Sequence, residues 1–296
     1  MLRPEQASLF MLLLVFSTGP GCSVPRRLVA FDAVGVAGAE VTLAAKLEGS
    51  GVGAVRRDIQ GARVSFELAG QGGVGLTDDD GVARCVLRAP PAATTRVTVR
   101  GAGLAAQARV YAFDPQRPVA VVDIDGTLST MATWRVALSG DEAEAYEGAA
   151  ELLRALSQRA AIVYLTARDD AFDAVTRAFL ERHGFPEGPV LFNDWGFSTP
   201  AARAQLSTRN HGAFKLSVLR SLQERGLNLK VGIGNSRGDA EAYQAAGLLG
   251  FIRGDGGAGI GERFDRYAEL WPRLRAQGLL PASPGRGQER RPGGGR

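Results

Sequence analysis

Three unbroken apolar runs mark the second half of the chain, at residues 118–122, 161–165 and 229–233. They lack the alternation of a half-buried strand, so they predict strands that are buried on both faces of a parallel sheet. Between them, leucines recur at helical spacing in 148–156 and 215–222. Strands that alternate with helices in this way predict an α/β domain with a Rossmann-like parallel sheet.

The first half of the chain follows a different pattern. Short β-type segments are separated by glycine and aspartate turns, and apolar positions alternate in 64–68 and 97–99. The turn at 78–83 resembles a strand start in bacterial immunoglobulin-like domains. We therefore expect an N-terminal all-β immunoglobulin-like sandwich. Its expected strands are 40–44, 63–68, 81–87, 95–100 and 106–111.

An apolar stretch of eight residues, 9–16, follows Arg3 near the start of the chain. It is too short to span a bilayer but fits the core of a signal peptide. Residues 19–22 resemble a bacterial lipoprotein cleavage box, so we expect Cys22 to be acylated and to anchor the protein to a membrane surface of the cell envelope. Ordinary cleavage near Gly19, which would release a secreted or periplasmic protein, is the alternative. Both readings predict export.

Length and composition predict two globular domains. The chain has 296 residues, of which 45% are hydrophobic. We place a signal segment at 1–22, the sandwich at 23–115, the α/β domain at 116–278 and a disordered tail rich in arginine, glycine and proline at 279–296. A formal net charge of +4 is mild for this size. No nucleic-acid-binding module, zinc-ligand spacing or repeat is present, so we expect no nucleic-acid partner.

Two carboxylates, Asp123 and Asp125, directly follow the first apolar run. The carboxyl ends of strands in open α/β sheets are where ligands bind. A plain strand would send these side chains to opposite sides, but the Gly126 turn lets both converge on one ion. Two like charges so close are costly without a compensating cation. A hard divalent ion with oxygen ligands, Mg²⁺, fits best.

The other two runs are also followed by polar side chains. Thr166 ends the second run, and Asn235 and Asp239 follow the third. Lys215 opens the leucine-spaced segment between them. Carboxylates, a hydroxyl, an ammonium and an Asn/Asp pair are the parts of a phosphoryl-transfer site.

This ordered set resembles the haloacid dehalogenase superfamily of phosphohydrolases. Residues 123–127 match its first motif, Thr166 its second, Lys215 its third and 234–239 its fourth. The resemblance implies a catalytic set of Asp123, Asp125, Thr166 and Lys215. Asp123 would attack phosphorus, Asp125 would protonate the leaving alkoxide and later activate water, and Thr166 and Lys215 would hold phosphoryl oxygens.

The resemblance also implies a Mg²⁺ site. Asn235 and Asp239 would complete the metal shell together with Asp123 and the backbone carbonyl of Asp125. The charge of Lys215 and of the cation would keep Asp123 ionised as a nucleophile.

Within that superfamily, the chain resembles the C-terminal catalytic domain of lipins, which are Mg²⁺-dependent phosphatidate phosphatases. The likeness covers about residues 118–260 and implies phosphatidate in a membrane as substrate. The family's N-terminal conserved region and amphipathic membrane helix are missing from the pattern. The matching segments are 123–128, 164–168, 188–191, 214–215 and 234–243.

The spacing of the motifs leaves no room for a large cap domain. About twenty residues separate Thr127 from Gly148, which is too few for a folded cap, and 166–215 is filled by a helix, a strand and a loop. An open site favours bulky or membrane-embedded phosphoesters. One alternative keeps the chemistry but gives it a soluble phosphoester or a phosphoprotein as substrate. The other is a catalytically silent lipid-binding or adhesion module.

Overall fold

The computed structural model describes residues 26–52, 55–130, 143–193 and 208–281. The chain forms two compact units, and each draws on separate stretches of sequence. The limits that we predict for the domains remain a prediction. The first unit comprises residues 1–115, 166–171 and 189–227, and the second comprises 116–165, 172–188 and 228–296.

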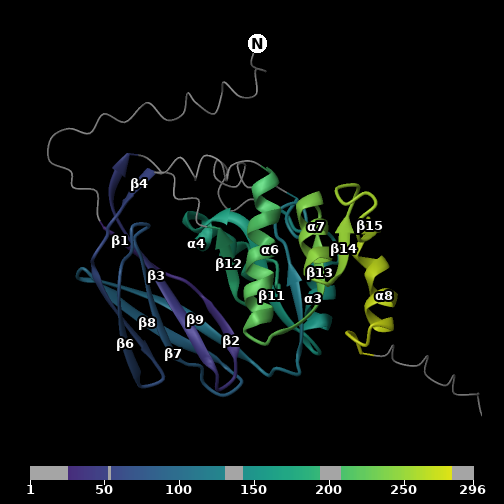
Figure 1. The fold of residues 1–296 in the computed structure, drawn as a ribbon. Helices are drawn as coiled ribbons and strands as arrows, with labels where there is room; N and C mark the ends of the chain where they lie inside the picture. Colours follow the sequence, from purple (N-terminus) through teal and green to yellow (C-terminus); the bar gives the residue numbers. More distant parts are fainter. Residues whose placement is uncertain (1–25, 53–54, 131–142, 194–207, 282–296) are drawn as a thin grey trace, which may run out of the picture. The chain divides into compact units, whose positions relative to one another are not determined.

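The first unit contains two β-sheets (Figure 1). In the four-stranded sheet, β3 (Glu40–Val52) pairs with β1 (Arg27–Ala30), β4 (Val55–Asp58) and β7 (Val82–Arg88). The five-stranded sheet runs in the order β2 (Ala33–Val36), β9 (Leu104–Phe113), β8 (Thr94–Gly101), β5 (Arg63–Leu68) and β6 (Gln71–Leu76). Neighbouring strands in both sheets run antiparallel, except that β2 pairs with β9 in parallel. The predicted all-β region is therefore present, and its immunoglobulin-like character stays a prediction.

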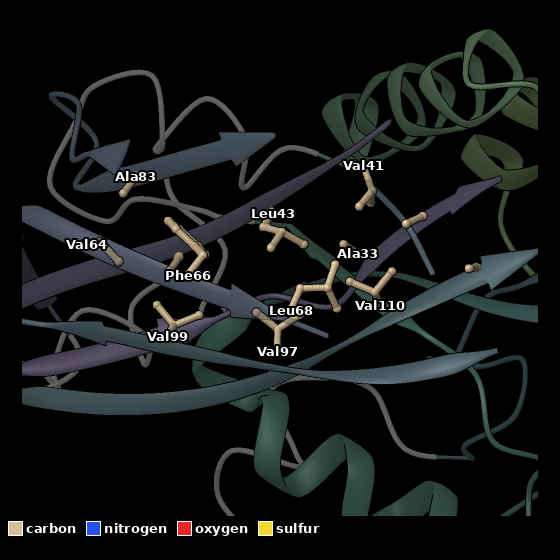
Figure 2. Packing of buried hydrophobic residues seen from close by; sticks show 13 residues of the cluster. Ala33, Val41, Leu43, Val64, Phe66, Leu68, Ala83, Val97, Val99 and Val110 are labelled. Carbon is tan, nitrogen blue, oxygen red and sulfur yellow. The ribbon is translucent and has the colours of Figure 1, made fainter. Parts of the chain in front are cut away.

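One hydrophobic cluster joins the two sheets of this unit (Figure 2). Alternation along β5 buries Val64, Phe66 and Leu68, while the residues between them face outward. These side chains meet Val41 and Leu43 from β3 of the other sheet. Full burial of each large apolar side chain stabilises the fold by about 1.5–3 kcal/mol, so this cluster is the main support of the all-β region.

The glycine-rich strand β6 escapes prediction from its sequence. Glycine weakens a strand and carries no side chain to pack, so the pattern of residues 71–76 reads as a loop. The structure gives the glycines a use: a Cβ on Gly73 would lie 2.2 Å from the Cys85 Sγ, and one on Gly75 would lie 2.4 Å from the Arg84 carbonyl oxygen. The glycines thus let β6 approach β7 closely. The strands β1, β2 and β4 are also additional to the prediction, and β3 extends past residue 44 to Val52.

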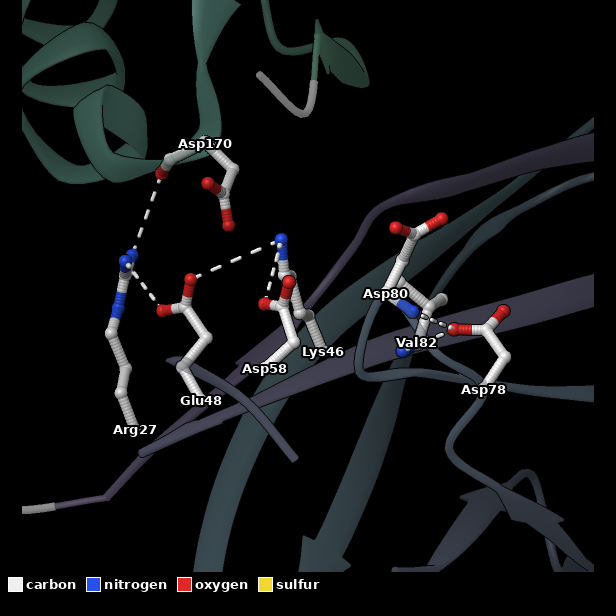
Figure 3. A network of polar contacts seen from close by, with 8 residues as sticks. All are labelled: Arg27, Lys46, Glu48, Asp58, Asp78, Asp80, Val82 and Asp170. Carbon is white, nitrogen blue, oxygen red and sulfur yellow. Dashed lines mark hydrogen bonds and ion pairs between the residues drawn. The ribbon is translucent and has the colours of Figure 1, made fainter. Parts of the chain in front are cut away.

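A chain of buried and partly buried charges lies on the four-stranded sheet (Figure 3). Lys46 is only 2% exposed, and its Nζ lies 3.4 Å from Asp58 Oδ1 and 4.0 Å from Glu48 Oε1. Glu48 also pairs with Arg27 at 3.5 Å, and Arg27 donates to the Asp170 carbonyl oxygen at 3.5 Å. Because an isolated buried ammonium is costly, Lys46 depends on these carboxylates.

Replacing Lys46 with methionine should lower the free energy of unfolding by about 3 kcal/mol or more, since it removes the ammonium that lies closest to the Asp58 carboxylate and offsets part of the charge of Glu48. Urea unfolding measures this change. The matched control is Arg100→Met, which removes the exposed ion pair of Arg100 with Glu67 at 3.3 Å and should cost less than about 1 kcal/mol. Equal unfolding midpoints for the two variants would contradict the prediction.

The second unit contains a parallel sheet, as the apolar runs predict. β10 (Pro118–Val122) pairs with β11 (Ala161–Asp169), whose residues up to Leu165 belong to this unit, and with β13 (Asn228–Gly234). β14 (Leu249–Arg253) and β15 (Glu262–Phe264) extend the sheet beyond β13. Residues 119–122 are fully buried, which confirms a strand covered on both faces.

The helix α3 of the second unit follows the expected apolar spacing. In α3 (Ala149–Ser157), the buried residues include Leu152, Leu153 and Leu156, the face that the leucine pattern predicts. In the described part of this unit, the other helical elements are α4 (Asp173–Arg182), α7 (Arg237–Ala245), α8 (Leu270–Ala276) and the 3₁₀ turn η2 (Tyr267–Glu269). The short turn η1 (Asp170–Phe172) falls across the boundary between the units. The mixed α/β class is confirmed.

The first unit also holds β12 (Val190–Asn193) and α6 (Thr208–Glu224). Asp32 accepts from the Arg109 backbone N–H at 3.0 Å and from that of Val190 at 3.4 Å. Arg225, just after α6, donates to the Val34 carbonyl oxygen at 3.4 Å. These contacts explain why stretches distant in sequence belong to one unit.

Several predictions concern residues outside the described part of the chain. These are the signal segment with Cys22, nearly all of the tail, and the intervals 131–142 and 194–207. The two intervals lie in the spans for which we predict no large cap domain. Within the described ranges, no helix combines the length and apolar character needed to cross a bilayer.

Candidate active site

Two neighbouring parallel strands, β10 and β13, end side by side in the second unit. Val122 pairs with Ile233, and the next backbone N–H, that of Asp123, donates to the Ile233 carbonyl oxygen at 2.9 Å. Asp123 and Asn235 therefore leave the sheet at the same edge. The Asp123 side chain is nearly fully buried, at 3% exposure, so its carboxylate has little water to stabilise it.

The hydroxyl of Thr127 links these two strand ends. Its Oγ1 lies 2.8 Å from Asp123 Oδ2, to which it donates, and 3.3 Å from Asn235 Oδ1. Thr127 is itself completely buried. The predicted nucleophile and one predicted metal ligand are thus brought together around one hydroxyl.

The turn after Asp125 owes its shape to Gly126, which adopts a left-handed φ of 71°. The backbone N–H groups of Leu128 and Ser129 both donate to the Ile124 carbonyl oxygen, at 2.8 and 2.9 Å. Asp125 pairs with Ser129 in an isolated β-bridge. The curled turn that the sequence predicts after the first carboxylate is present.

Asp239 occupies the third position of α7 and closes a capping box with Ser236. Its Oδ2 accepts from the backbone N–H of Asn235 at 3.1 Å, from the backbone N–H of Ser236 at 2.9 Å and from the Ser236 hydroxyl at 2.7 Å. A Cβ on Gly234 would lie 2.5 Å from the Asp239 Cβ. The glycine therefore allows this carboxylate to lie directly against the end of β13.

Two buried tyrosines support the same edge, and the sequence pattern does not single them out. Tyr243 donates to the Ile233 carbonyl oxygen at 3.1 Å, and Tyr267 donates to the Thr127 carbonyl oxygen at 2.6 Å. Burial raises the pKa of Tyr243 well above its usual value, and the charges of Asp239 and Asp123 raise it further. Burial likewise raises the pKa of Tyr267, opposed by the charge of Arg253. Both phenols thus remain protonated donors at neutral pH.

The spacing of residues along the sequence could have identified only one of these tyrosines, Tyr243, as a neighbour of the site. Tyr243 is four residues after Asp239 and therefore shares its face of α7. Tyr267 lies 140 residues from its acceptor at Thr127, so no local pattern connects them.

The donor set at this edge fits a hard cation. Asp123, Asn235 and Asp239, with the backbone carbonyl of Asp125, offer only oxygen ligands, which are the kind that Mg²⁺ takes. The 3.3 and 2.8 Å contacts to the Thr127 hydroxyl place Asn235 and Asp123 oxygens close to each other. No group of three His, Cys, Asp or Glu side chains suited to a metal occurs in the described ranges; the expected set includes only two such side chains among its ligands.

Thr166 and Lys215 belong to the first unit, whereas the carboxylates belong to the second. Thr166, in β11, is fully buried and its Oγ1 accepts from the Arg168 backbone N–H at 3.1 Å. Lys215 is 4% exposed and lies within α6. The sequence reading that Lys215 opens its helix is wrong, because α6 begins seven residues earlier at Thr208. Their contacts with phosphoryl oxygens remain a prediction.

Comparison with curated proteins gives no match. Among solved structures, a D,D-heptose 1,7-bisphosphate phosphatase from B. bronchiseptica, complexed with magnesium and phosphate, is 16% identical over 55% of this chain and 99% of that chain, with a TM-score of 0.42. A haloacid dehalogenase superfamily hydrolase from Geobacter sulfurreducens is 14% identical over 53% of this chain and 96% of that one, with a TM-score of 0.35.

A chain from the Pnkp1/Rnl/Hen1 RNA repair complex is 16% identical over 46% of this chain, with a TM-score of 0.38, and the match spans 42% of its own length.

The finding that bears on function is a family match. Residues 120–250, which include all the predicted site residues from Asp123 to Asp239, match the family model of the LNS2 domain of PITM 1-3, and this match supports a phosphatase of the haloacid dehalogenase type.

Proposed function

We propose that this chain is a Mg²⁺-dependent phosphatase that hydrolyses phosphatidate, or a related lipid phosphomonoester, through an aspartyl-phosphate. The observation that carries this proposal is the arrangement around the Thr127 hydroxyl, 2.8 Å from Asp123 and 3.3 Å from Asn235. A buried carboxylate at a parallel strand end, next to further oxygen ligands, has the composition of a phosphoryl-transfer site.

The proposed reaction has two steps. A carboxylate oxygen of Asp123 forms a bond to phosphorus, the ester P–O bond breaks, and Asp125 gives its proton to the departing alkoxide. Asp125, now ionised, takes a proton from water, whose oxygen attacks the same phosphorus. The acyl-phosphate P–O bond then breaks, and inorganic phosphate and the free Asp123 carboxylate result.

Charge compensation is the main requirement of both steps. Mg²⁺, when bound by oxygens of Asp123, Asn235, Asp239 and the Asp125 carbonyl, supplies positive charge that offsets the negative charge of the phosphoryl group. Asp239 is fixed by its three hydrogen bonds at the start of α7. The side chains of Thr166 and Lys215 would donate hydrogen bonds to the phosphoryl oxygens.

The lipid substrate rests on the resemblance to lipins and on the LNS2 family match. We also propose that the protein is exported and held at the cell-envelope membrane by acylated Cys22, which would bring the domain to its substrate. An immunoglobulin-like all-β region would then act in spacing or docking.

Phosphate release by the purified chain tests the substrate. Phosphatidate vesicles are compared with a soluble aryl phosphate, each with Mg²⁺ and with a chelator. The proposal predicts Mg²⁺-dependent release that is faster from vesicles than from the soluble ester. Vesicles of phosphatidylcholine alone serve as the blank.

Each other outcome selects a different function. Release from the soluble ester alone would keep the phosphatase and discard the lipid. A folded protein that binds phosphatidate vesicles but releases no phosphate would favour a silent lipid-binding module.

A further inference from the structure

Two side chains from the last part of the second unit hold the turn that follows Asp125. Arg253, the final residue of β14, donates from Nη1 to the Gly126 carbonyl oxygen at 3.5 Å. Tyr267, in η2, donates to the next carbonyl oxygen, that of Thr127, at 2.6 Å. Successive carbonyls of one turn are thus fixed from outside it.

Arg253 packs on the ring of Tyr146, a residue whose backbone contacts the same turn. Its guanidinium carbon lies 3.4 Å from the centroid of the Tyr146 ring, a close cation–π contact. The Tyr146 backbone N–H donates to the Leu128 carbonyl oxygen at 2.9 Å. The turn from Gly126 to Leu128 and these two side chains therefore form one connected assembly.

The geometry of Arg253 is not the best one for stability. Its Nε is buried and has no hydrogen-bond partner among the described residues. Such a donor costs about 1–3 kcal/mol when it is left unsatisfied, so the position of Arg253 calls for an explanation.

Tyr267 also interacts electrostatically with Asp123, the proposed nucleophile. The pKa of Tyr267 is raised first by burial and also by the charge of Asp123, and it is lowered by the charge of Arg253. Asp123 and Arg253 therefore each lie within electrostatic reach of Tyr267. Gly126, whose carbonyl Arg253 holds, is the residue directly after Asp125.

We infer that Arg253 and Tyr267 are positioning residues that fix the turn of Asp125 for proton transfer to the leaving group, an inference that rests on the proposed function. Proton transfer in a transition state requires the acid within hydrogen-bond reach of the departing oxygen. Small displacements of a reacting group cause large losses of rate. Both residues lie beyond residue 250, where the LNS2 match ends. The side chains that hold the Asp125 turn therefore come from the part of the chain that follows the matched segment.

The leaving group of the substrate separates positioning from a general structural role. A strongly acidic phenol departs without a proton, whereas an alkyl alcohol needs one. In Arg253→Met, kcat/KM for an alkyl phosphate should fall by about 30-fold or more, while that for the aryl phosphate of an acidic phenol should fall by less than about 3-fold. KM should change little for either ester.

Three further variants make the result specific. Arg253→Lys keeps a charged donor and should recover part of the alkyl phosphate rate. Tyr267→Phe, which removes the second hydrogen bond, should show the same leaving-group dependence and provides the test if Arg253→Met does not fold. Arg263→Met removes an exposed arginine that pairs with Asp255 and Asp265 at 2.9 and 3.1 Å, and both rates should stay unchanged.

Equal losses on the two esters would overturn the inference in favour of general destabilisation, and unchanged rates on both would overturn it outright. A wild-type chain that releases no phosphate from these two esters or from phosphatidate vesicles would refute the proposed function itself. That outcome is recognised in the wild type alone, without reference to any variant.

Discussion

Asp123→Asn is expected to abolish phosphate release. An amide cannot act as the nucleophile, and loss of a covalent catalyst lowers kcat by about 10⁴-fold or more. The substitution is nearly isosteric, and an amide oxygen can still accept the hydrogen bond that Thr127 donates to Oδ2 at 2.8 Å. The fold should therefore persist while turnover is lost. A single-turnover assay with a radiolabelled phosphomonoester measures both turnover and the labelled acyl-phosphate, which should also be missing.

The matched control for this experiment is Asp265→Asn. Asp265 is an exposed carboxylate in the same unit and pairs with Arg263 at 3.1 Å, so its loss should leave turnover within about 2-fold of the wild type, as for other surface changes. Phosphate release by folded Asp123→Asn at the wild-type rate would exclude Asp123 as the nucleophile.

The sequence predicts the elements of the second unit well because their signals are local. An unbroken apolar run specifies a strand that is covered on both faces, and β10 begins and ends at the predicted residues. Leucine spacing identifies the buried face of α3 for the same reason. Local patterns do not predict β6, because its glycines carry no apolar side chain that would signal a strand. These glycines are needed only because β7 lies close to β6.

The candidate site divides in the same way. The carboxylates stand out because polar residues directly follow buried strands, and the Ser-x-x-Asp spacing at 236–239 is by itself a capping-box signal in the sequence. Arg253 and Tyr267 could not be found by such reasoning, since each meets the Asp125 turn through more than a hundred residues of separation. Their role depends on tertiary contacts alone.

The role of Gly126 follows from the sequence and the structure together. The sequence identifies it as the turn that lets the first motif curl, and the structure adds a close approach. A Cβ at this position would lie 2.1 Å from Asn235 Nδ2, and the φ of 71° is one that other residues rarely adopt. Alanine at this position must therefore both strain the turn and displace a predicted metal ligand.

Gly247 separates these two effects, because it has the same φ of 71° but no atom within 4 Å of an added Cβ. Both Gly126→Ala and Gly247→Ala should lower the free energy of unfolding by about 1–2 kcal/mol through backbone strain. Only Gly126→Ala should also lower kcat/KM, by about 100-fold or more, since an error of about 1 Å at a reacting centre costs this much. It should also raise the Mg²⁺ concentration needed for half-maximal activity, because Asn235 is displaced. Equal losses of activity in the two variants would instead assign the effect to strain, and the approach of Asn235 to the turn would then have no part in catalysis.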